Sequence, residues 1–212
     1  MFFPTYKHEK QKLSQGFKII AGSDEVGVGP LAGPVVAASV ILDPESIGKR
    51  RSRNKWWYEV RDSKQLTEKQ RAELVNFIKD NSLDWAVSRV EHETIDQINI
   101  LQASLLAMEK SIERLKNFLP DFILVDGRNQ VPHLSCPQEA IIDGDQKVLS
   151  ISCASILAKV ARDNLLNEFH KLYPRYGFDR HKGYPTKEHR AAIAKYGLCP
   201  IHRRSFLSVK QV

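Results

Sequence analysis

Residues 17–42 read FKIIAGSDEV (17–26), GVGPLAGP (27–34) and VVAASVIL (35–42), and this stretch decides the fold class. Residues 17–26 are largely apolar and end in acid, whereas residues 35–42 are an uninterrupted run of β-branched and small side chains. Such a run is typical of a strand that is buried on both faces. The glycines and prolines between the two segments predict a tight turn, so we expect a β-hairpin.

Helical and strand-like segments alternate along the rest of the chain. Thr67 and Gln70 match a capping box that begins a helix, and Thr186 and Gly197 mark the two ends of another. Apolar spacing predicts further elements at residues 85–90 (strand), 94–118 (helix), 122–125 (strand), 140–142 (strand) and 151–170 (helix). This order predicts an α/β fold, and the opening hairpin makes its sheet mixed.

Length and composition suggest how the chain is organised. For 212 residues we expect a flexible lead-in over residues 1–16, a main domain over 17–170 and a helical extension over 171–212 packed on it. A net charge of +7 favours a polyanionic partner without proving one. No apolar run reaches the ~18 residues that span a bilayer, so we expect no membrane partner. Three cysteines without metal-ligand spacing and an N-terminus without a signal-peptide pattern favour the cytoplasm.

Acidic side chains follow three of the expected strands. These are Asp24 with Glu25, then Asp126, and then Asp145. Functional residues of α/β sheets gather at the carboxyl ends of strands, where four converging carboxylates would repel one another unless a cation neutralised them. Oxygen ligands suit Mg²⁺ or Mn²⁺. Alternatively, each acid is an ordinary loop residue that follows a strand, and the pattern alone supports both interpretations equally.

The turn at residues 27–34 allows three interpretations. Its glycines resemble a dinucleotide-binding loop, but Pro30 and Pro34 stand where such a loop would open a helix. It can also be a nest of backbone amides that approaches a phosphate or a sugar hydroxyl. The third interpretation is a tight hairpin that binds nothing.

Residues 23–38, SDEVGVGPLAGPVVAA, closely resemble the opening motif of type 2 ribonuclease H, the ribonuclease HII family. Further family-like motifs follow in the same order and extend the resemblance over residues 18–206. They are DSKQL (62–66), VDG (125–127), GD (144–145), SISCASILAKVARD (150–163), YGF (176–178), HKGYPT (181–186) and HRRSF (202–206).

This resemblance implies a ribonuclease-H-like fold and an endonuclease that hydrolyses the RNA strand of RNA–DNA hybrids. The products would carry 3′-hydroxyl and 5′-phosphate ends, and two ions, Mg²⁺ or Mn²⁺, would take part. It implies that the catalytic metal ligands are Asp24, Glu25, Asp126 and Asp145. The expected partners are RNA–DNA hybrid and duplex DNA containing ribonucleotides, bound by a monomer.

The resemblance also implies how the substrate is read. Only the 2′-hydroxyl distinguishes a ribonucleotide from a deoxyribonucleotide at one position. Backbone groups of Gly27, Val28 and Gly29 are expected at that hydroxyl and the adjacent phosphate, and Tyr184 at the neighbouring deoxyribose. Expected phosphate contacts are Ser63, Lys64 and Lys159.

Two residues depart from the family pattern. Val28 stands where the family usually has arginine, which removes a charge-assisted phosphate contact worth about 1.5–3 kcal/mol. Cleavage beside a single ribonucleotide embedded in DNA is therefore expected to be weaker. Asp143 stands where the family usually has lysine and adds negative charge before Asp145.

Several other residues have structural explanations. By analogy with the family we expect Asp163 to pair with a nearby base. We expect His181, His189 and His202 to be hydrogen-bonded structural residues, because the proposed cation prefers oxygen. The basic aromatic stretch at residues 49–58 either tracks a nucleic-acid backbone or is a solvated surface loop with partly buried rings.

Two other functions compete with hybrid hydrolysis. One is a nuclease of the same fold that acts on another substrate, such as branched DNA. The other is a protein that binds hybrid duplex without cutting it. The Gly-x-Gly turn and the Tyr184 motif argue against the first, and the four acids argue against the second.

Overall fold

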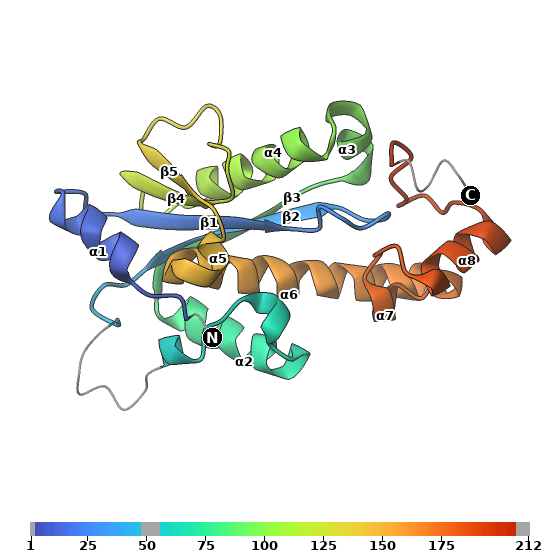
Figure 1. Ribbon diagram of the computed structural model, residues 1–212, viewed down its shortest axis with the longest axis horizontal. Coiled ribbons are helices and arrows are strands. Elements are labelled where there is room, and N and C mark those ends of the chain that lie inside the picture. The colour runs from blue at the N-terminus through green and yellow to red at the C-terminus, as the bar shows by residue number, and fades with distance from the viewer. Residues whose placement is uncertain (1–2, 48–55, 207–212) are drawn as a thin grey trace.

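The computed structural model describes residues 3–47 and 56–206, which form a five-stranded sheet with helices on both faces (Figure 1). The strand order across the sheet is β3-β2-β1-β4-β5. The strands are β1 Ile20–Val26, β2 Val35–Leu42, β3 Ser82–Val90, β4 Phe122–Asp126 and β5 Gln138–Ile141. The predicted hairpin, β1 with β2, occupies the centre of this sheet.

The strands pair in both directions, so the sheet is mixed as predicted. β1 runs antiparallel to β2, and β2 runs antiparallel to β3. On the other side of β1, β4 runs parallel to β1 and β5 runs parallel to β4. Parallel strands bring their carboxyl ends to one edge of the sheet, so residues that follow β1, β4 and β5 meet there.

Helices cover the two faces of the sheet, α4 on one side and α6 with α2 on the other (Figure 1). The helices are α1 Lys7–Ser14, α2 Glu68–Asp80, α3 His92–Ile98, α4 Ile100–Glu113, α5 Gly144–Lys147, α6 Leu149–Leu172, α7 Phe178–His181 and α8 Lys187–Tyr196. Alternate side chains of β2 pack into both layers, which explains its continuous apolar sequence.

Local sequence signals explain how individual elements begin and approach one another. Thr67 caps α2, and the predicted capping box with Gln70 is present. A side chain at Gly22 of β1 would collide with Ser150 and with the backbone of Ile151 in α6. Glycine therefore lets the sheet and α6 come into close contact.

The helix predicted over residues 94–118 is two helices instead. Asn99 separates α3 from α4 with a φ of 68°, and its side chain accepts a hydrogen bond from the Gln102 backbone N–H at 3.1 Å. Asn tolerates this left-handed conformation better than most residues. Apolar periodicity continues across the break, because both helices pack on the same face, and so could not reveal it.

The lead-in expected to be flexible contains a helix. Residues 7–14 form α1, and Glu9 lies buried, with Oε1 accepting the Ser150 backbone N–H at 2.8 Å. A carboxylate at the start of α6 satisfies one of its free amides and complements the helix dipole. The polar composition of residues 1–16 concealed this tertiary contact.

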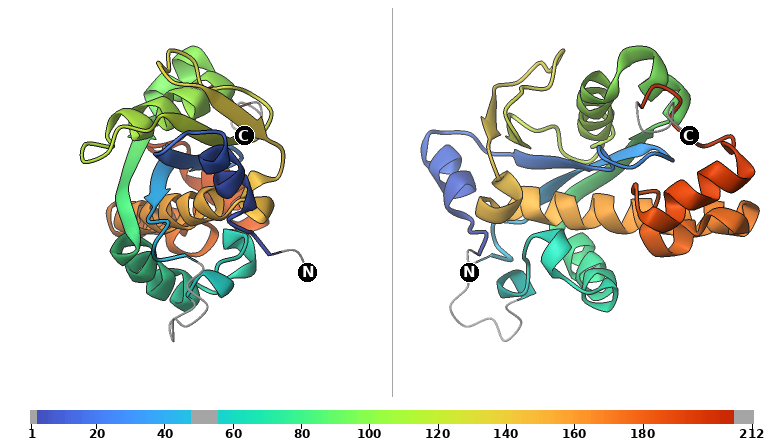
Figure 2. Two further views of the ribbon diagram at one scale, coloured as in Figure 1. Left: turned by 90° about the vertical axis from the view of Figure 1, so that its left-hand side faces the viewer. Right: turned by 45° about the vertical axis from the view of Figure 1, so that its right-hand side comes forward.

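The C-terminal segment packs on the end of α6 and against the turn between β1 and β2. Its short 3₁₀ turn Pro174–Tyr176, α7 and α8 bury Tyr176, Phe178 and Ile193 together with Leu31 of the turn. Figure 2 shows this segment beside the tip of the hairpin. Within the described residues, no helix combines the length and apolar character needed to cross a membrane.

The predicted basic aromatic stretch is only partly covered by the structure. Residues 49–55 lie outside the described residues. Trp56–Tyr58 form a 3₁₀ turn in which Trp56 is buried and Tyr58 is exposed. The aromatic end of the stretch is thus partly built into the core.

Candidate active site

Asp24 and Asp126 lie side by side at the ends of neighbouring parallel strands. Ser23 of β1 is paired with Val125 of β4, and each acid is the next residue along its strand. Leu124, two residues before Asp126, packs on the α6 side of the sheet. Because strand side chains alternate between faces, both acids point to that side.

Glu25 and Asp145 join these two acids from different elements. Glu25 follows Asp24 in β1, so it points to the opposite face of the sheet. Asp145 follows a strand as expected but not directly, because β5 stops at Ile141 and Asp145 lies in the short helix α5. The Asp126 carboxylate accepts the backbone N–H of Gly144 at 2.7 Å and of Asp145 at 3.4 Å, which holds α5 at the end of β4.

One cavity of ≈ 300 Å³ contains every candidate site residue identified from the sequence. These are the acids Asp24, Glu25, Asp126 and Asp145, the turn residues Gly27, Val28 and Gly29, and Ser63, Lys64, Lys159 and Tyr184. Val26 and Ser155 complete the lining. Segments far apart in the sequence therefore meet around a single space.

Burial and mutual repulsion raise the pKa values of three of the acids. Burial is the largest cause for Asp24, whose pKa lies well above its usual value, and the charges of Glu25 and Asp126 raise it further. Burial raises the pKa of Glu25, and the charge of Asp126 raises it further, whereas a hydrogen bond with the Ser104 hydroxyl lowers it. The pKa of Asp145 is raised by burial and then by Asp126. The group therefore carries a repulsion that nearby cations would relieve.

Lys64 supplies one positive charge to this group. Its Nζ lies 3.4 Å from Oδ2 of Asp145, and 75% of its side chain is exposed. Burial alone would lower the Lys64 pKa, but the charges of Asp145 and Asp62 raise it overall. A lysine held this loosely can reach toward an incoming phosphate.

The donor set fits a hard divalent cation such as Mg²⁺ or Mn²⁺, because the acids at the cavity offer only oxygen. Across residues 3–47 and 56–206, no three His, Cys, Asp or Glu side chains are already arranged as a ring of metal ligands. Asp24 instead accepts the Glu25 backbone N–H at 2.7 Å, and Asp126 accepts that of Gly144. The fit is therefore one of chemistry and charge, in which ion binding would turn these carboxylates from backbone donors toward the cation.

The glycine turn, residues 27–34, reaches the cavity beside Tyr184. Gly27 has a φ of 105°, and a side chain there would collide with Arg162. A Cβ added to Gly29 would lie 3.7 Å from Cε1 of Tyr184, so the ring borders this part of the turn. Val28 and Tyr184 are 43% and 39% exposed, which leaves both accessible to a ligand.

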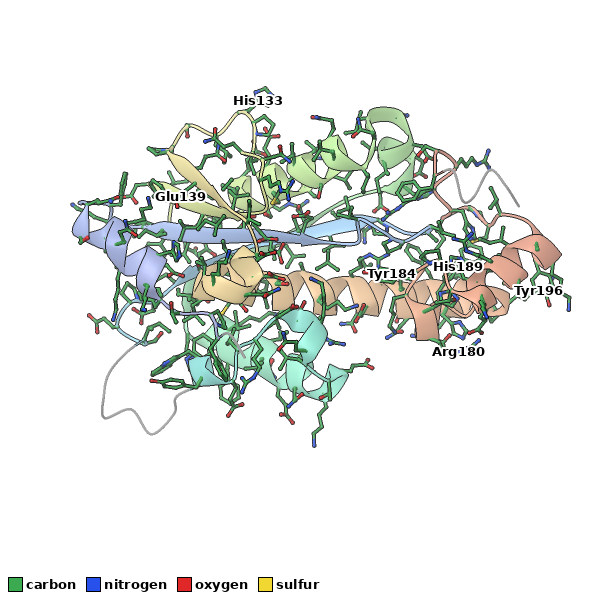
Figure 3. All side chains as sticks on the ribbon, viewed as in Figure 1. His133, Glu139, Arg180, Tyr184, His189 and Tyr196 are labelled. Atoms are coloured by element: carbon green, nitrogen blue, oxygen red, sulfur yellow. The ribbon has the colours of Figure 1, made fainter. Side chains whose placement is uncertain are left out.

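A chain of hydrogen bonds holds the Tyr184 backbone, and Figure 3 shows His189 beside Tyr184. Nδ1 of His189 lies 2.9 Å from the Tyr184 carbonyl, and its Nε2 lies 3.1 Å from Nε2 of His202. Nδ1 of His202 accepts the Cys199 backbone N–H at 2.9 Å. All of these hydrogen bonds can form when both rings are neutral, with His189 protonated on Nδ1 and His202 on Nε2. Burial lowers both pKa values to about 4, and the two histidines are structural as expected.

His181 makes the same kind of structural contact. Its Nε2 lies 2.6 Å from the Tyr176 carbonyl, and its Nδ1 accepts the Gly183 backbone N–H at 3.2 Å. The His181 ring stacks on that of His189 at 4.4 Å between centroids. All three C-terminal histidines thus support the segment that carries Tyr184.

The other predicted cavity residues are partly engaged with protein partners. Lys159 pairs with Asp163 at 2.8 Å, as expected for Asp163. The buried Ser63 hydroxyl lies 3.1 Å from that of Ser155. Asp143 is not part of the cavity lining; its Oδ2 lies 3.9 Å from Nζ of Lys147, and 63% of its side chain is exposed. Its extra charge is therefore largely solvated.

Three further residues shape the site, and the sequence did not reveal them. Ser155 lines the cavity, and its hydroxyl lowers the pKa of Asp24. Arg162 and Arg203 are buried beneath the glycine turn. All three lie inside motifs quoted from the sequence, but a polar residue in an otherwise apolar helix or in a basic tail gives no sign that it is buried.

The model of the ribonuclease HII family matches residues 21–209 of this chain. A ribonuclease HII from Caldicellulosiruptor saccharolyticus is 49% identical over 202 residues, covering 95% of this chain and 93% of that protein. A ribonuclease HII from Endomicrobium trichonymphae is 47% identical over 212 residues, covering 100% and 96%.

Solved structures share the architecture. The ribonuclease H2 from Pyrococcus horikoshii superimposes with a TM-score of 0.73 at 28% identity, covering 92% of this chain and 96% of that one. The ribonuclease HII from Archaeoglobus fulgidus, solved in a complex with PCNA, gives 0.71 at 25% identity, covering 88% and 94%. A Bst-RNase HIII solved with Mn²⁺ gives 0.67 at 17% identity, covering 91% and 68%, which shows the fold alone.

Proposed function

Because this chain belongs to the ribonuclease HII family, and is therefore an endonuclease that degrades the RNA of RNA–DNA hybrids, we propose that Asp24, Glu25, Asp126 and Asp145 are its catalytic group. The observation that supports this assignment is their position around one cavity, where burial and mutual repulsion raise the pKa values of Asp24, Glu25 and Asp145. A protein that only bound duplexes would gain nothing from burying carboxylates that repel one another.

The four carboxylates would hold two divalent ions, Mg²⁺ or Mn²⁺. When bound, such ions supply an activated water and stabilise the leaving oxygen of a phosphodiester. The chain's own contribution is to hold the acidic oxygens in place, with Asp126 and the α5 turn locked together by backbone hydrogen bonds. Hydrolysis leaves 3′-hydroxyl and 5′-phosphate ends.

Recognition of the ribose is proposed to fall to the glycine turn. Backbone groups of Gly27, Val28 and Gly29 face the 2′-hydroxyl and the adjacent phosphate, and Tyr184 stacks on the next, deoxy, sugar. The close approach of Gly29 to the Tyr184 ring supports this, because it brings both groups to the same end of the cavity.

Phosphates of the duplex are proposed to contact Ser63, Lys64 and Lys159. Lys64 is the most available of the three, since most of its side chain is exposed. Lys159 is held by Asp163, which fixes its position while leaving its charge at the cavity wall. Such contacts orient a duplex without reading its sequence.

Duplex DNA with a single ribonucleotide is a further proposed substrate, cut less efficiently because Val28 places no charge at the turn. We also propose that the protein acts as a monomer in the cytoplasm, in DNA replication and repair. Its net charge of +7 is consistent with a polyanionic substrate.

A cleavage assay tests the proposed function. The purified protein is incubated with Mg²⁺ or Mn²⁺ and three end-labelled duplexes of one sequence: RNA–DNA hybrid, DNA with one ribonucleotide, and all-DNA. We expect the hybrid to be cut fastest and the all-DNA duplex not at all. Cleavage of all-DNA would favour a nuclease of different specificity, and binding without any cleavage would contradict the catalytic assignment.

A further inference from the structure

Arg203 is fully buried behind the glycine turn and binds three of its carbonyl groups. Its Nε donates to the Gly33 carbonyl at 2.9 Å, its Nη1 to Val28 at 3.1 Å and its Nη2 to Gly27 at 2.6 Å. A planar guanidinium can hold several acceptors in one fixed arrangement, which a lysine cannot do. The path of the turn therefore follows the shape of this side chain.

Arg162 of α6 supports the same turn from beside Arg203. It is also fully buried, and it donates to the carbonyls of Pro34 at 3.1 Å, Ala32 at 3.1 Å and Lys182 at 3.0 Å. Lys182 lies two residues before Tyr184, so Arg162 joins the glycine turn to the segment that carries the proposed sugar-stacking ring. One helix thus sets the spacing between two parts of the cavity.

The direction of these carbonyls determines where the amides point. In a planar trans peptide the C=O and the next N–H point in opposite directions. Because the Gly27 and Val28 carbonyls point inward to Arg203, the N–H groups of Val28 and Gly29 point away from it. Both residues line the cavity, and in the described chain neither amide donates to another backbone group. Two free donors therefore face the space where a substrate would lie.

The two buried charges make this arrangement strongly preferred. The three contacts of each guanidinium go to backbone carbonyls, and burial lowers the pKa of Arg203 to about 9 and of Arg162 to about 10. A buried cation is costly when it loses its partners, so any other path of the turn is disfavoured. Cations at the carbonyl side also polarise the peptides and strengthen their N–H groups as donors.

Backbone hydrogen bonds of the C-terminal segment hold Arg203 beneath the glycine turn. The Gly33 N–H donates to the Ile201 carbonyl at 2.9 Å, and the Arg203 N–H donates to the Leu31 carbonyl at 2.8 Å. On the other side, Asp96 of α3 accepts the backbone N–H of Arg204 at 2.8 Å. The segment is therefore anchored to both α3 and the turn.

We propose that Arg203, together with Arg162, is a positioning residue that sets ribose selectivity by fixing the glycine turn with the amides of Val28 and Gly29 facing the sugar. This inference rests on the proposed function, since it assumes that these amides read the 2′-hydroxyl. Neither arginine lines the cavity, and both are fully buried.

Arg203→Lys is the test variant, because it keeps the positive charge but removes the planar guanidinium that binds three carbonyl groups at once. Arg204→Lys is the matched control, since it makes the same change at the adjacent exposed residue, whose observed contact uses only its backbone. Each variant is also made in an Asp126→Asn background, which we expect to bind duplexes without cutting them. The ratio of Kd for all-DNA to Kd for hybrid then measures ribose selectivity in folded protein.

We expect Arg203→Lys to reduce this ratio by about tenfold or more, whereas Arg204→Lys changes it less than about twofold. A merely structural role would lower the melting temperature and leave the ratio per folded molecule unchanged. A folded Arg203→Lys protein with the parental ratio overturns the proposal. Should this variant not fold, Arg162→Lys is subjected to the same measurement with the same expected loss.

A substrate-free measurement separates failure of this inference from failure of the proposed function. In protein labelled with ¹⁵N-glycine, we expect Arg203→Lys to shift the amide signals of Gly27, Gly29 and Gly33, and Arg204→Lys to leave them unchanged. Unshifted signals overturn the positioning role. If Arg203→Lys shifts these signals but the parent protein cuts no hybrid, the proposed function is overturned instead.

Discussion

The Asp126 carboxylate accepts the backbone N–H of Gly144 at 2.7 Å, so one proposed metal ligand positions the helical turn that carries another, Asp145. A Cβ added to Gly144 would lie 3.0 Å from the same Asp126 oxygen and 2.8 Å from Ile151. Glycine at this position therefore allows β4, α5 and α6 to meet closely enough to form the acidic end of the cavity.

Asp24→Asn and Asp126→Asn should each reduce cleavage of RNA–DNA hybrid by about a thousandfold or more, because each removes a charge that would hold the metal ions. Asp143→Asn is the matched control, since Asp143 is an exposed acid next to the site, and it should retain nearly normal activity. Single-turnover cleavage with circular dichroism as a folding check measures this. Normal turnover in either site variant would refute the catalytic assignment.

Asp24→Asn should also stabilise the metal-free protein. Asp24 is buried beside Glu25 and Asp126, whose charges disfavour its ionised form. Replacing it with a neutral side chain of similar size should increase the free energy of unfolding by roughly 1 kcal/mol, or 2–4 °C in melting temperature. Thermal unfolding in EDTA tests this at neutral pH, and a lower melting temperature than that of the parent would contradict the electrostatic argument.

Divalent ions should stabilise the parent protein in the absence of nucleic acid. An ion at about a hundred times its Kd adds roughly 2.7 kcal/mol if it binds only the folded state. Titrating Mg²⁺ or Mn²⁺ should therefore raise the melting temperature of the parent and have little effect on Asp24→Asn/Asp126→Asn. An equal rise in both proteins would place the bound ions elsewhere.

Val28→Arg should improve cleavage at a single ribonucleotide in duplex DNA by about tenfold, the equivalent of one charge-assisted phosphate contact. Val28 is exposed at the cavity and has an ordinary backbone conformation, so a longer side chain has room. Val28→Met is the control for size without charge. If kcat/KM at the embedded ribonucleotide is the same for both variants, the missing charge is not what limits this substrate.

The His189–His202 pair should make the protein less stable as pH falls from about 6.5 to about 4. Burial lowers both pKa values from 6.5 to about 4, so in this window the unfolded chain binds protons that the folded protein does not. Above this window neither state is protonated and the pair contributes no pH dependence. The rings share a hydrogen bond, so we expect a combined loss on the order of 2–4 kcal/mol.

Urea unfolding at several pH values measures this loss. The acids with raised pKa values act in the opposite direction, so the comparison is with His189→Asn/His202→Asn, which keeps the acids and removes the pair. The double variant should be less stable than the parent at neutral pH, and the difference should shrink as the pH falls. A constant difference would show that the two histidines do not titrate with unfolding.

Much of the site followed from local sequence. The buried run at residues 35–42 and the turn before it predicted the hairpin, because strand pairing across a short connection is a local event. Acids directly after apolar segments predicted the positions of Asp24 and Asp126, since parallel strands end at one edge. The start of one helix at Thr67 and the end of another at Gly197 could also be predicted from the sequence, because each depends on neighbours within four residues.

Tertiary structure alone decided the rest. Periodicity could not show the break at Asn99, the burial of Glu9 against α6, or the helical setting of Asp145, because each depends on contacts with residues distant in sequence. Arg203 lies 176 positions from Gly27, whose carbonyl it binds. The sequence alone shows which residue types are available for the chemistry. The direction in which the backbone amides of the glycine turn point depends on two buried arginines, and only folding brings these beneath the turn.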